Sequence, residues 1–323
     1  MSTVEYENIQ NASKEERQRI VDGFYWHHSI DFGDGVASKG GGNIAYINEQ
    51  ARALYDGINM HGRSLLDIGA WNGAFSFEAK RRGCDRVLAT DHYCWNNAQF
   101  KGRETFDLAR SLLQLDIDAL DIDVPEINPQ SVGQFDIVLF SGVFYHLINP
   151  VHLLRQISQC AKNTLIVETW QDMLDSDRPG MIFYPGTVLN GDGSNWWGPN
   201  PQAMYEILKE LGFTHVFYQD APRRRDPKGK MFRERGIYHA FRTWESIFEM
   251  GGPHASWQHL ENPDVRKIVF EPVLPKARRD EVEQLARLKA ENERLTRENA
   301  ALRESTSWKI TAPIRAIKRL VSG

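Results

Sequence analysis

The sequence predicts an α/β fold built on a largely parallel sheet. Short apolar runs and helical segments alternate between residues 64 and 169, and this alternation is typical of parallel βαβ units. The 323 residues are 41% hydrophobic and 25% charged, which is the composition of a globular protein with a full core. Wholesale disorder, collagen-like repeats and a disulfide-stapled miniprotein are therefore excluded.

The predicted elements follow one another in a regular order. Ser13 and Glu16 form a capping-box pattern that begins a helix ending near Gly23. The glycine-rich and aromatic residues 24–42 then predict a loop or hairpin that covers the core. Strands are expected at 64–69, 86–91, 119–124, 135–142 and 163–169, and helices at 44–61, 74–82, 97–114, 151–161 and 204–213. A basic loop joins residues 213–219 to 237–242, so these two strands are expected to form an antiparallel pair at one sheet edge.

The C-terminal segment changes character. Leu288, Leu295 and Leu302 fall on d of a heptad, and Asn292 and Asn299 fall on a, which predicts a coiled coil and a homodimer. The alternative is a single amphipathic helix docked on the body. Four parts are thus expected: an N-terminal helical cap and aromatic flap (1–60), the α/β domain (61–275), a coiled coil (276–304) and a basic amphipathic tail (305–323).

Charge and cysteine content point to a cytoplasmic protein. Residues 276–323 hold 12 Lys and Arg against 7 Asp and Glu, so the net charge of −4 divides into +5 for this segment and −9 for the rest. The basic tail is a candidate for peripheral contact with the inner membrane surface, and a frayed terminus is the alternative. The three cysteines lie far apart, and the polar N-terminus lacks the pattern of a signal peptide.

A glycine turn at residues 67–73 is the first candidate binding element. Gly69 and Gly73 allow a sharp bend and close ligand approach, but the spacing fits neither the dinucleotide fingerprint nor a P-loop. Asp91 ends the next strand, where an acid can accept both hydroxyls of a ribose. Candidate nucleoside-binding residues are Asp67, Gly69, Ala70, Trp71, Asn72, Gly73, Asp91, His92, Asp121, Ile122, Ser141 and Gly142.

These motifs resemble the class I S-adenosylmethionine-dependent methyltransferases over about residues 60–245. LLDIGAWNG stands where that family has its glycine-rich first motif, Asp91 matches its ribose-binding acid, and FDIVLFSG matches its fourth-strand motif. The resemblance implies a Rossmann-like, seven-stranded sheet with helices on both faces and S-adenosyl-L-methionine as cofactor. A nucleotide-binding α/β protein of another kind is the alternative.

Three further segments are similar to the branch named for tRNA wobble-uridine modification, namely residues 26–40, 142–150 and 184–204. That branch includes (mo5U)-type O-methyltransferases and uridine carboxymethyltransferases. The latter use basic residues to hold the extra carboxylate of their cosubstrate. His28 stands near Trp26 in place of an obvious lysine, which favours plain S-adenosylmethionine, whereas Lys39 and Arg155 keep the carboxylated form open.

Methyl transfer needs an aligned acceptor and, for a hydroxyl acceptor, a base. His146 and His28 are the candidate bases, and Tyr145 is a candidate wall or hydrogen-bond donor. The alternative for His146 is a helix cap or a bond to a backbone carbonyl. The sequence has no HxxxH motif and no carboxylate cluster, so no metal is expected.

Aromatic residues are expected to contact the acceptor. The candidates are Trp26, His27, Asn195, Trp196 and Trp197, since aromatic planes stack on sugars and bases. The alternative is that these tryptophans fill the core. Residues 222–242 hold eight Lys and Arg against two acids, which suits a phosphate-bearing acceptor or is a solvated loop.

Three functions are compatible with these patterns. The first is O-methylation of a sugar, glycan or related small acceptor in cell-envelope polysaccharide biosynthesis, because STSWKITAPIRAIKR resembles tails of bacterial polysaccharide-assembly proteins. The second is methylation of 5-hydroxyuridine at the tRNA wobble position. The third is a non-catalytic scaffold, which the intact Asp67, Gly69, Gly73 and Asp91 argue against.

Overall fold

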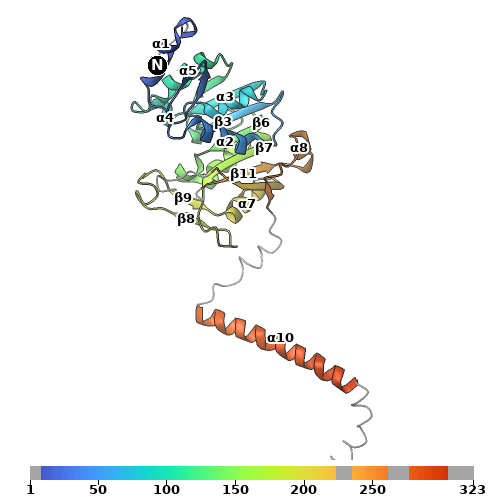
Figure 1. Cartoon of the computed structure of the whole chain (residues 1–323). Coiled ribbons are helices and arrows are strands. Elements are labelled where there is room, and N and C mark those ends of the chain that lie inside the picture. Colours follow the sequence, from blue (N-terminus) through green and yellow to red (C-terminus); the bar gives the residue numbers. More distant parts are fainter. Residues whose placement is uncertain (1–8, 223–234, 261–275, 305–323) are drawn as a thin grey trace, which may run out of the picture. The chain divides into compact units, whose positions relative to one another are not determined.

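The computed structural model describes residues 9–222, 235–260 and 276–304 (Figure 1). The chain divides into two units, Met1–Ile268 and Val269–Gly323. The first unit contains the sheet and the helices that pack on it. The described part of the second unit is one helix, α10 (Lys276–Glu304). The basic loop 223–234 and the tail 305–323, to which the sequence assigns roles, lie outside the described residues.

The first unit is built on an eight-stranded sheet in the order β12-β10-β11-β7-β6-β3-β4-β5. The strands are β3 (Ser64–Ile68), β4 (Arg86–Asp91), β5 (Asp118–Asp121), β6 (Phe135–Ser141), β7 (Ala161–Trp170), β10 (His215–Asp220), β11 (Arg235–Phe241) and β12 (Gln258–His259). The strands β5, β4, β3, β6 and β7 are parallel, whereas β11, β10 and β12 pair antiparallel. The predicted parallel sheet and its antiparallel pair are therefore confirmed, and β12 adds a short outer strand.

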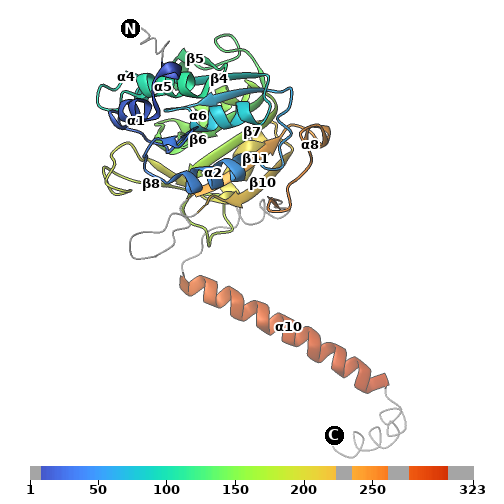
Figure 2. The same cartoon turned by 45° about the horizontal axis from the view of Figure 1, so that its top comes forward.

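Helices cover both faces of this sheet (Figure 2). They are α1 (Lys14–Asp22), α2 (Ile44–Tyr55), α3 (Ala74–Arg81), α4 (Tyr93–Asn96), α5 (Gly102–Leu113), α6 (Pro150–Ser158), α7 (Pro201–Glu210) and α8 (Trp244–Glu249), with short 3-10 turns at Ile9–Asn11, Val124–Glu126 and Phe144–His146. Successive strand residues point to opposite faces, so Leu65 joins the core under α2, α3 and α5, and Leu66 joins the core under α6 and α7.

Two helix predictions change in the structure. The helix expected over 44–61 ends at Tyr55, because Gly57 has a left-handed φ of 91° that a helix cannot continue. The helix expected over 97–114 begins only at Gly102, as α5, because Lys101 takes a left-handed φ of 49°, and a separate short helix, α4, precedes it at Tyr93–Asn96. The chain therefore turns twice after β4, and this turn brings the α4 residues beside the carboxyl end of that strand.

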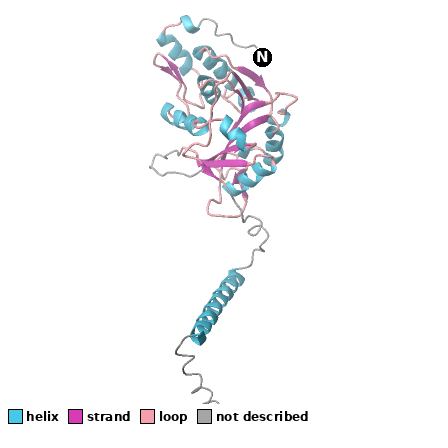
Figure 3. Cartoon of the chain, turned by 90° about the vertical axis from the view of Figure 1, so that its right-hand side faces the viewer, coloured by secondary structure: helices cyan, strands magenta, loops and turns pink. Residues whose placement is uncertain are grey.

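Two hairpins accompany the sheet, visible as short strands in Figure 3. The flap at 24–42 contains β1 (Asp31–Gly33) and β2 (Val36–Ala37), as the glycines predict. The second hairpin, β8 (Met181–Phe183) with β9 (Trp197–Pro199), is not predicted by the sequence. Over the described residues, none of the helices has the length and apolar character needed to cross a membrane.

Candidate active site

A cavity of about 260 Å³ lies at the carboxyl ends of β3, β6 and β7. Ligands bind at this edge in open α/β sheets. One wall comes from the strand ends and the glycine turn, and a second comes from the flap and α2. Tyr145 and Arg235 form the third wall. The lining includes His27, His28, Asp67, Gly69, Trp71, Ser141, Gly142, Tyr145, His146, Glu168 and Arg235.

The glycine turn lets the backbone approach a ligand closely. Gly69 has a φ of 80°, and a Cβ built there would lie 2.5 Å from Cγ2 of Val143. Gly73 has a φ of 83°, and its position starts α3. Between them Trp71 adopts a left-handed φ of 49°, which costs free energy for a residue with a Cβ and is common where a site imposes it. The shape of the turn thus depends on both glycines and on the backbone of Trp71 between them.

Asp67 is a buried carboxyl group that lines the cavity. Ser76 Oγ donates a hydrogen bond to its Oδ2 at 2.5 Å. Burial raises the pKa of Asp67 to about 7, and the neighbouring Asp91 contributes to the rise. A cation in the cavity would favour the ionised form of this group, so Asp67 is suited to a positively charged ligand.

Asp91 is held at the end of β4 by the main chain. The N–H groups of Trp71 and Cys94 donate to its two carboxyl oxygens at 3.0 and 2.9 Å. Burial raises the pKa of Asp91, and these backbone donors oppose the rise. The carboxyl group is therefore fixed beside the glycine turn, where the ribose of a nucleoside is expected.

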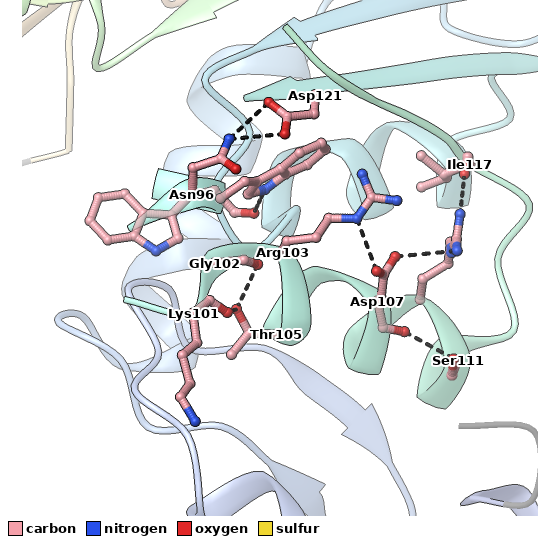
Figure 4. A network of polar contacts seen from close by, with 12 residues as sticks. Asn96, Lys101, Gly102, Arg103, Thr105, Asp107, Ser111, Ile117 and Asp121 are labelled. Carbon is pink, nitrogen blue, oxygen red and sulfur yellow. Dashed lines mark hydrogen bonds and ion pairs between the residues drawn. The ribbon is translucent and has the colours of Figure 1, made fainter. Parts of the chain in front are cut away.

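A polar network lies at the ends of β4 and β5 (Figure 4). Asn96 Nδ2 donates to both carboxyl oxygens of Asp121 at 3.0 and 2.9 Å, and His92 Nδ1 lies 2.8 Å from Oδ1. The Asp121 bond raises the pKa of His92. The side chain of Ile122 packs against the core below. This network is solvent-exposed and lies outside the cavity lining, at the edge where the adenine is expected.

These residues fit S-adenosylmethionine. The cavity offers Asp67 for the cationic amino-acid end, and beside the cavity the fold places Asp91 for the ribose and the His92–Asp121 edge for the adenine. Gly69 lines the cavity, and a Cβ there would clash with Val143, so the turn needs a glycine to pack against that side chain. Ala70 and Gly73 complete the turn. Asn72 has another role, since its Oδ1 accepts from the N–H of His27 at 2.7 Å and its Nδ2 donates to Thr105 Oγ1.

Three histidines line the cavity, and two of them, His28 and His146, are neutral near pH 7. Burial, followed by His27 and Arg235, lowers the pKa of His28 well below its usual value. Burial also lowers the pKa of His146. The Nδ1 atom of His146 lies 3.0 Å from the carbonyl oxygen of Ser194. Ser194 Oγ also lies 3.0 Å from Nδ1, but its proton is donated to Asp192 at 2.7 Å. Both Ser194 oxygens therefore accept, so Nδ1 carries the proton and Nε2 keeps its lone pair. The alternative bond of His146 to a backbone carbonyl is therefore present, and it orients the ring.

A buried ion pair in the cavity was not predicted from the sequence. Arg235 Nη1 lies 3.1 Å from Oε1 of Glu168, and Nη2 donates to the hydroxyl of Tyr145. Ser141 Oγ donates to Glu168 at 3.2 Å. Burial raises the pKa of Tyr145, so its phenol stays neutral. The sequence could have indicated Glu168, because it is an acidic residue at the carboxyl end of a predicted strand. It does not single out Arg235, because that residue is one of several cations in a basic segment.

The expected acceptor residues divide in the structure. His27 lines the cavity and stacks on Trp71 with ring centroids 4.0 Å apart. Trp26 instead lies in the core, because its Nε1 donates to the Val21 carbonyl at 2.9 Å and its ring packs on Phe32. The expected contact of Trp26 with the acceptor is thus replaced by a packing role.

The Asn195–Trp197 segment also lies outside the cavity lining. Asn195 is buried and donates to the Leu189 carbonyl at 3.0 Å. Trp196 donates its main-chain N–H to the carbonyl of Tyr145 at 2.8 Å, and Trp197 packs on Phe183. These residues therefore hold the hairpin against Tyr145. They do not line the described cavity, so they are not placed for the direct contact with the acceptor that the sequence predicts.

Comparison with known proteins assigns the family. The family model described as "Methyltransferase domain" matches residues 44–217. A tRNA U34 carboxymethyltransferase from Geobacter sp. (strain M21) is 28% identical over 166 residues, covering 51% of this chain and 49% of that protein. The enzyme of the same name from Pseudomonas putida (strain GB-1) is 25% identical over 161 residues, covering 49% and 48%. The chain thus spans about half the length of the curated relatives it matches.

Solved structures of low similarity were also found. The N-terminal domain of EvdMO1 with SAH bound is 17% identical and covers 71% of this chain and 96% of that chain, with a TM-score of 0.49. Magnesium protoporphyrin IX methyltransferase from Synechocystis PCC 6803 is 16% identical and covers 73% and 97%, with a TM-score of 0.43. With the family model over more than half its length, the chain belongs to the methyltransferase domain family, in the S-adenosylmethionine-dependent class.

Proposed function

We propose that this protein transfers a methyl group from S-adenosylmethionine to a hydroxyl oxygen of its acceptor. One observation carries the proposal: the cavity joins the cosubstrate-binding strand ends to two neutral histidines. S-adenosylmethionine supplies a methyl group on a positively charged sulfur and leaves as S-adenosylhomocysteine. A neutral imidazole beside it can take the proton of an acceptor hydroxyl.

His146 is the proposed base. Its Nδ1 proton is held by the Ser194 carbonyl, so the proton of the acceptor is taken at Nε2. Tyr145 lies beside it with a neutral phenol held by Arg235, and it serves as a wall that positions the acceptor. His28 is the second candidate base, since its imidazole is neutral at the same cavity.

The proposed acceptor is a tRNA wobble uridine. The curated relatives named above are tRNA U34 enzymes, and they favour this acceptor over the others. Pro222 and Arg235 line the cavity, and the sequence between them holds six Lys and Arg against two acids. Cations at this place in the chain support an acceptor that carries phosphates.

A sugar or glycan hydroxyl is the second candidate. The tail sequence at 305–323 and the net charge of −9 over residues 1–275 favour it, because an acidic body repels a polyanion. A non-catalytic scaffold is the third. The retention of Asp67, Asp91 and the glycine turn around one cavity argues against that reading.

The proposed transferred group is a plain methyl. The relatives are named for a carboxymethyl group, which would bring a carboxylate into the cavity. The cation of Arg235 is already paired with Glu168, and His28 is neutral. Among the described residues that line the cavity, the Lys or Arg side chain is this paired Arg235, so we favour the uncarboxylated cosubstrate.

The first test is calorimetric titration with S-adenosylhomocysteine. The unchanged protein should bind it in the micromolar range, and Asp91→Ala should abolish binding, whereas Asp118→Ala on the exposed end of β5 should not. Absence of binding by the unchanged protein would favour the scaffold. Both S-adenosylmethionine and its carboxylated form are then offered, and the one consumed identifies the transferred group.

The second test identifies the acceptor. Nucleosides from the tRNA of a strain that lacks this gene are analysed by mass spectrometry, beside its envelope polysaccharide. Loss of a wobble-uridine methyl group supports tRNA, and restoration requires His146. Loss of a polysaccharide methyl group with unchanged tRNA would replace tRNA with the glycan.

A further inference from the structure

A row of aromatic rings leads from the cavity to the surface beside α4 and α5. Phe100 is the centre of this row, with Tyr25 at 6.0 Å, Tyr93 at 6.4 Å and Trp71 at 5.0 Å between ring centroids. The three outer rings, Tyr25, Tyr93 and Phe100, are named the aromatic rim. They come from the flap and from the segment after β4, so the fold brings them together.

The rim is exposed in a way that a packing role does not explain. Tyr25 is 53% exposed and Tyr93 is 69% exposed. Single exposed aromatic residues are common, but adjacent ones next to a cavity mark an interaction surface. Neither tyrosine belongs to the clusters that form the core of the sheet. The exposed rings are therefore available to a ligand that extends out of the cavity.

The rim is continuous with the cavity wall. Trp71 contacts Phe100 on one side and stacks on His27 on the other, with 13° between the planes. Both Trp71 and His27 line the cavity. The Trp71 carbonyl accepts a bond from Trp95 Nε1 at 2.7 Å, and its N–H is held by Asp91. Hydrogen bonds at its N–H and at its carbonyl thus fix the backbone that carries the Trp71 ring.

We infer that the aromatic rim stacks on a nucleobase adjacent to the nucleotide that enters the cavity. The inference rests on the proposed function, because a polymeric acceptor must leave the cavity along one of its walls. Stacking on an aromatic ring tolerates any base, so the rim adds affinity without adding sequence preference. The target base enters the cavity, and its neighbour lies on the rim.

The charges beside the rim favour RNA over a neutral glycan. The sequence from Tyr93 to Arg103 contains Lys101 and Arg103 and no acidic residue. The Arg103 guanidinium is paired with Asp107 at 2.9 Å, whereas Lys101 Nζ lies 5.8 Å from the ring centroid of Phe24 and at a loose 4.0 Å from Glu104. Lys101 is therefore an exposed cation beside the aromatic flap. A cation next to stacking rings is the arrangement that follows a phosphate backbone.

The test measures RNA binding and cosubstrate binding in the same variants. The probe is a labelled oligouridine RNA followed by fluorescence anisotropy, and S-adenosylhomocysteine is titrated by calorimetry. Tyr25→Ala and Tyr93→Ala should each weaken RNA binding about tenfold, and Tyr93→Phe should restore it because the ring remains. The control is Phe248→Ala, which removes a 63% exposed ring on α8 at the other end of the sheet.

Each other result overturns the inference in its own way. Unchanged RNA affinity in both tyrosine variants removes the rim from the RNA path, while normal S-adenosylhomocysteine binding leaves the proposed function standing. Weaker S-adenosylhomocysteine binding in Tyr93→Ala would assign the rim to the adenosine. Loss of binding to a neutral oligosaccharide, with unchanged RNA affinity, would assign it to a glycan.

Discussion

At the scale of single residues, burial decides the chemistry of the site. Asp67 and Asp91 end neighbouring strands, yet only Asp67 lines the cavity, and burial raises its pKa to about 7. Asp91 is surrounded by backbone donors. Burial also keeps His28 and His146 neutral, because it lowers the pKa of each imidazole. Near neutral pH, the charges that line the cavity are thus those of Asp67, whose carboxyl group titrates there, and of the Glu168–Arg235 ion pair.

The pKa of Asp67 makes cosubstrate binding depend on pH. From about pH 6 to about pH 8 its carboxyl group loses a proton, and the ionised form binds the α-ammonium group of S-adenosylhomocysteine better. Affinity should therefore rise with pH through 7 and level off above it, as followed by calorimetry. Asp67→Asn should bind more weakly and give a flat profile. A flat profile in the unchanged protein would contradict this assignment.

The Glu168–Arg235 pair should stabilise the fold in proportion to its burial. Glu168→Gln leaves the Arg235 guanidinium without its charge partner, and because Glu168 is buried while Arg235 is 34% exposed, the loss should be about 2 kcal/mol, between the costs of exposed and buried pairs. The control is Asp118→Asn, which breaks a looser 3.8 Å contact with Arg86 at the surface and should cost less than about 1 kcal/mol. Urea unfolding measures both, and equal losses would count against the pair.

At the scale of elements, the glycine turn and the flap depend on one another. The Asn72 side chain is fully buried between them, because it bonds the flap at His27 and α5 at Thr105. The turn that forms the cosubstrate edge therefore also closes the flap over the cavity. The β8–β9 hairpin makes a similar link, since Trp196 bonds the main chain of Tyr145.

Two glycines with the same backbone angle separate strain from crowding. Gly73 has a φ of 83° and Gly133 a φ of 85°, so an alanine at either position pays the left-handed penalty of about 1–2 kcal/mol. A Cβ at Gly73 would also lie 2.7 Å from Phe106 and Phe77, whereas nothing lies within 4 Å at Gly133. Gly73→Ala should therefore lose clearly more unfolding free energy in urea than Gly133→Ala.

The same pair of variants reports on the site. Gly73→Ala should weaken S-adenosylhomocysteine binding, because the start of α3 must shift away from the crowded rings. Gly133→Ala lies before β6 and should bind normally. Equal stability losses in the two variants would mean that the turn relaxes freely, and the rigid glycine turn would then be the wrong picture.

At the scale of the whole molecule, the chain holds a unit with the methyltransferase domain and a second unit whose described part is one helix. The helix α10 covers the residues assigned to the coiled coil, and Leu288 and Leu295 are 61% and 44% exposed on it. Exposed leucines at heptad spacing favour a second copy of the same helix as partner. Dimerisation through α10 and membrane contact through the tail stay predictions.

Removing the two leucines should separate the copies. Leu288→Ser with Leu295→Ser should convert a dimer into a monomer in light scattering coupled to gel filtration, while S-adenosylhomocysteine affinity stays unchanged. Lys289→Ser with Thr296→Ser, off the a and d positions of the same helix, should remain dimeric. A monomeric unchanged protein at all concentrations would refute the coiled coil.

Local patterns in the sequence determined the strands, their parallel order and the glycine turn with its following acid. Apolar runs, caps and turn residues act over short distances, so Asp67, Gly69 and Asp91 could be placed from the sequence alone. Helix ends were less certain, because Gly57 and Lys101 turn the chain inside helical patterns.

Only the tertiary structure decided which distant residues complete the site. Arg235 meets Tyr145 across 90 positions because β11 inserts beside β7, and no local pattern encodes that neighbour. Trp26 enters the core whereas the adjacent His27 lines the cavity, a choice set by the packing of the flap on α5. The sequence therefore specified the glycine turn and its acids, and the packing of remote strands and hairpins specified the rest of the cavity wall.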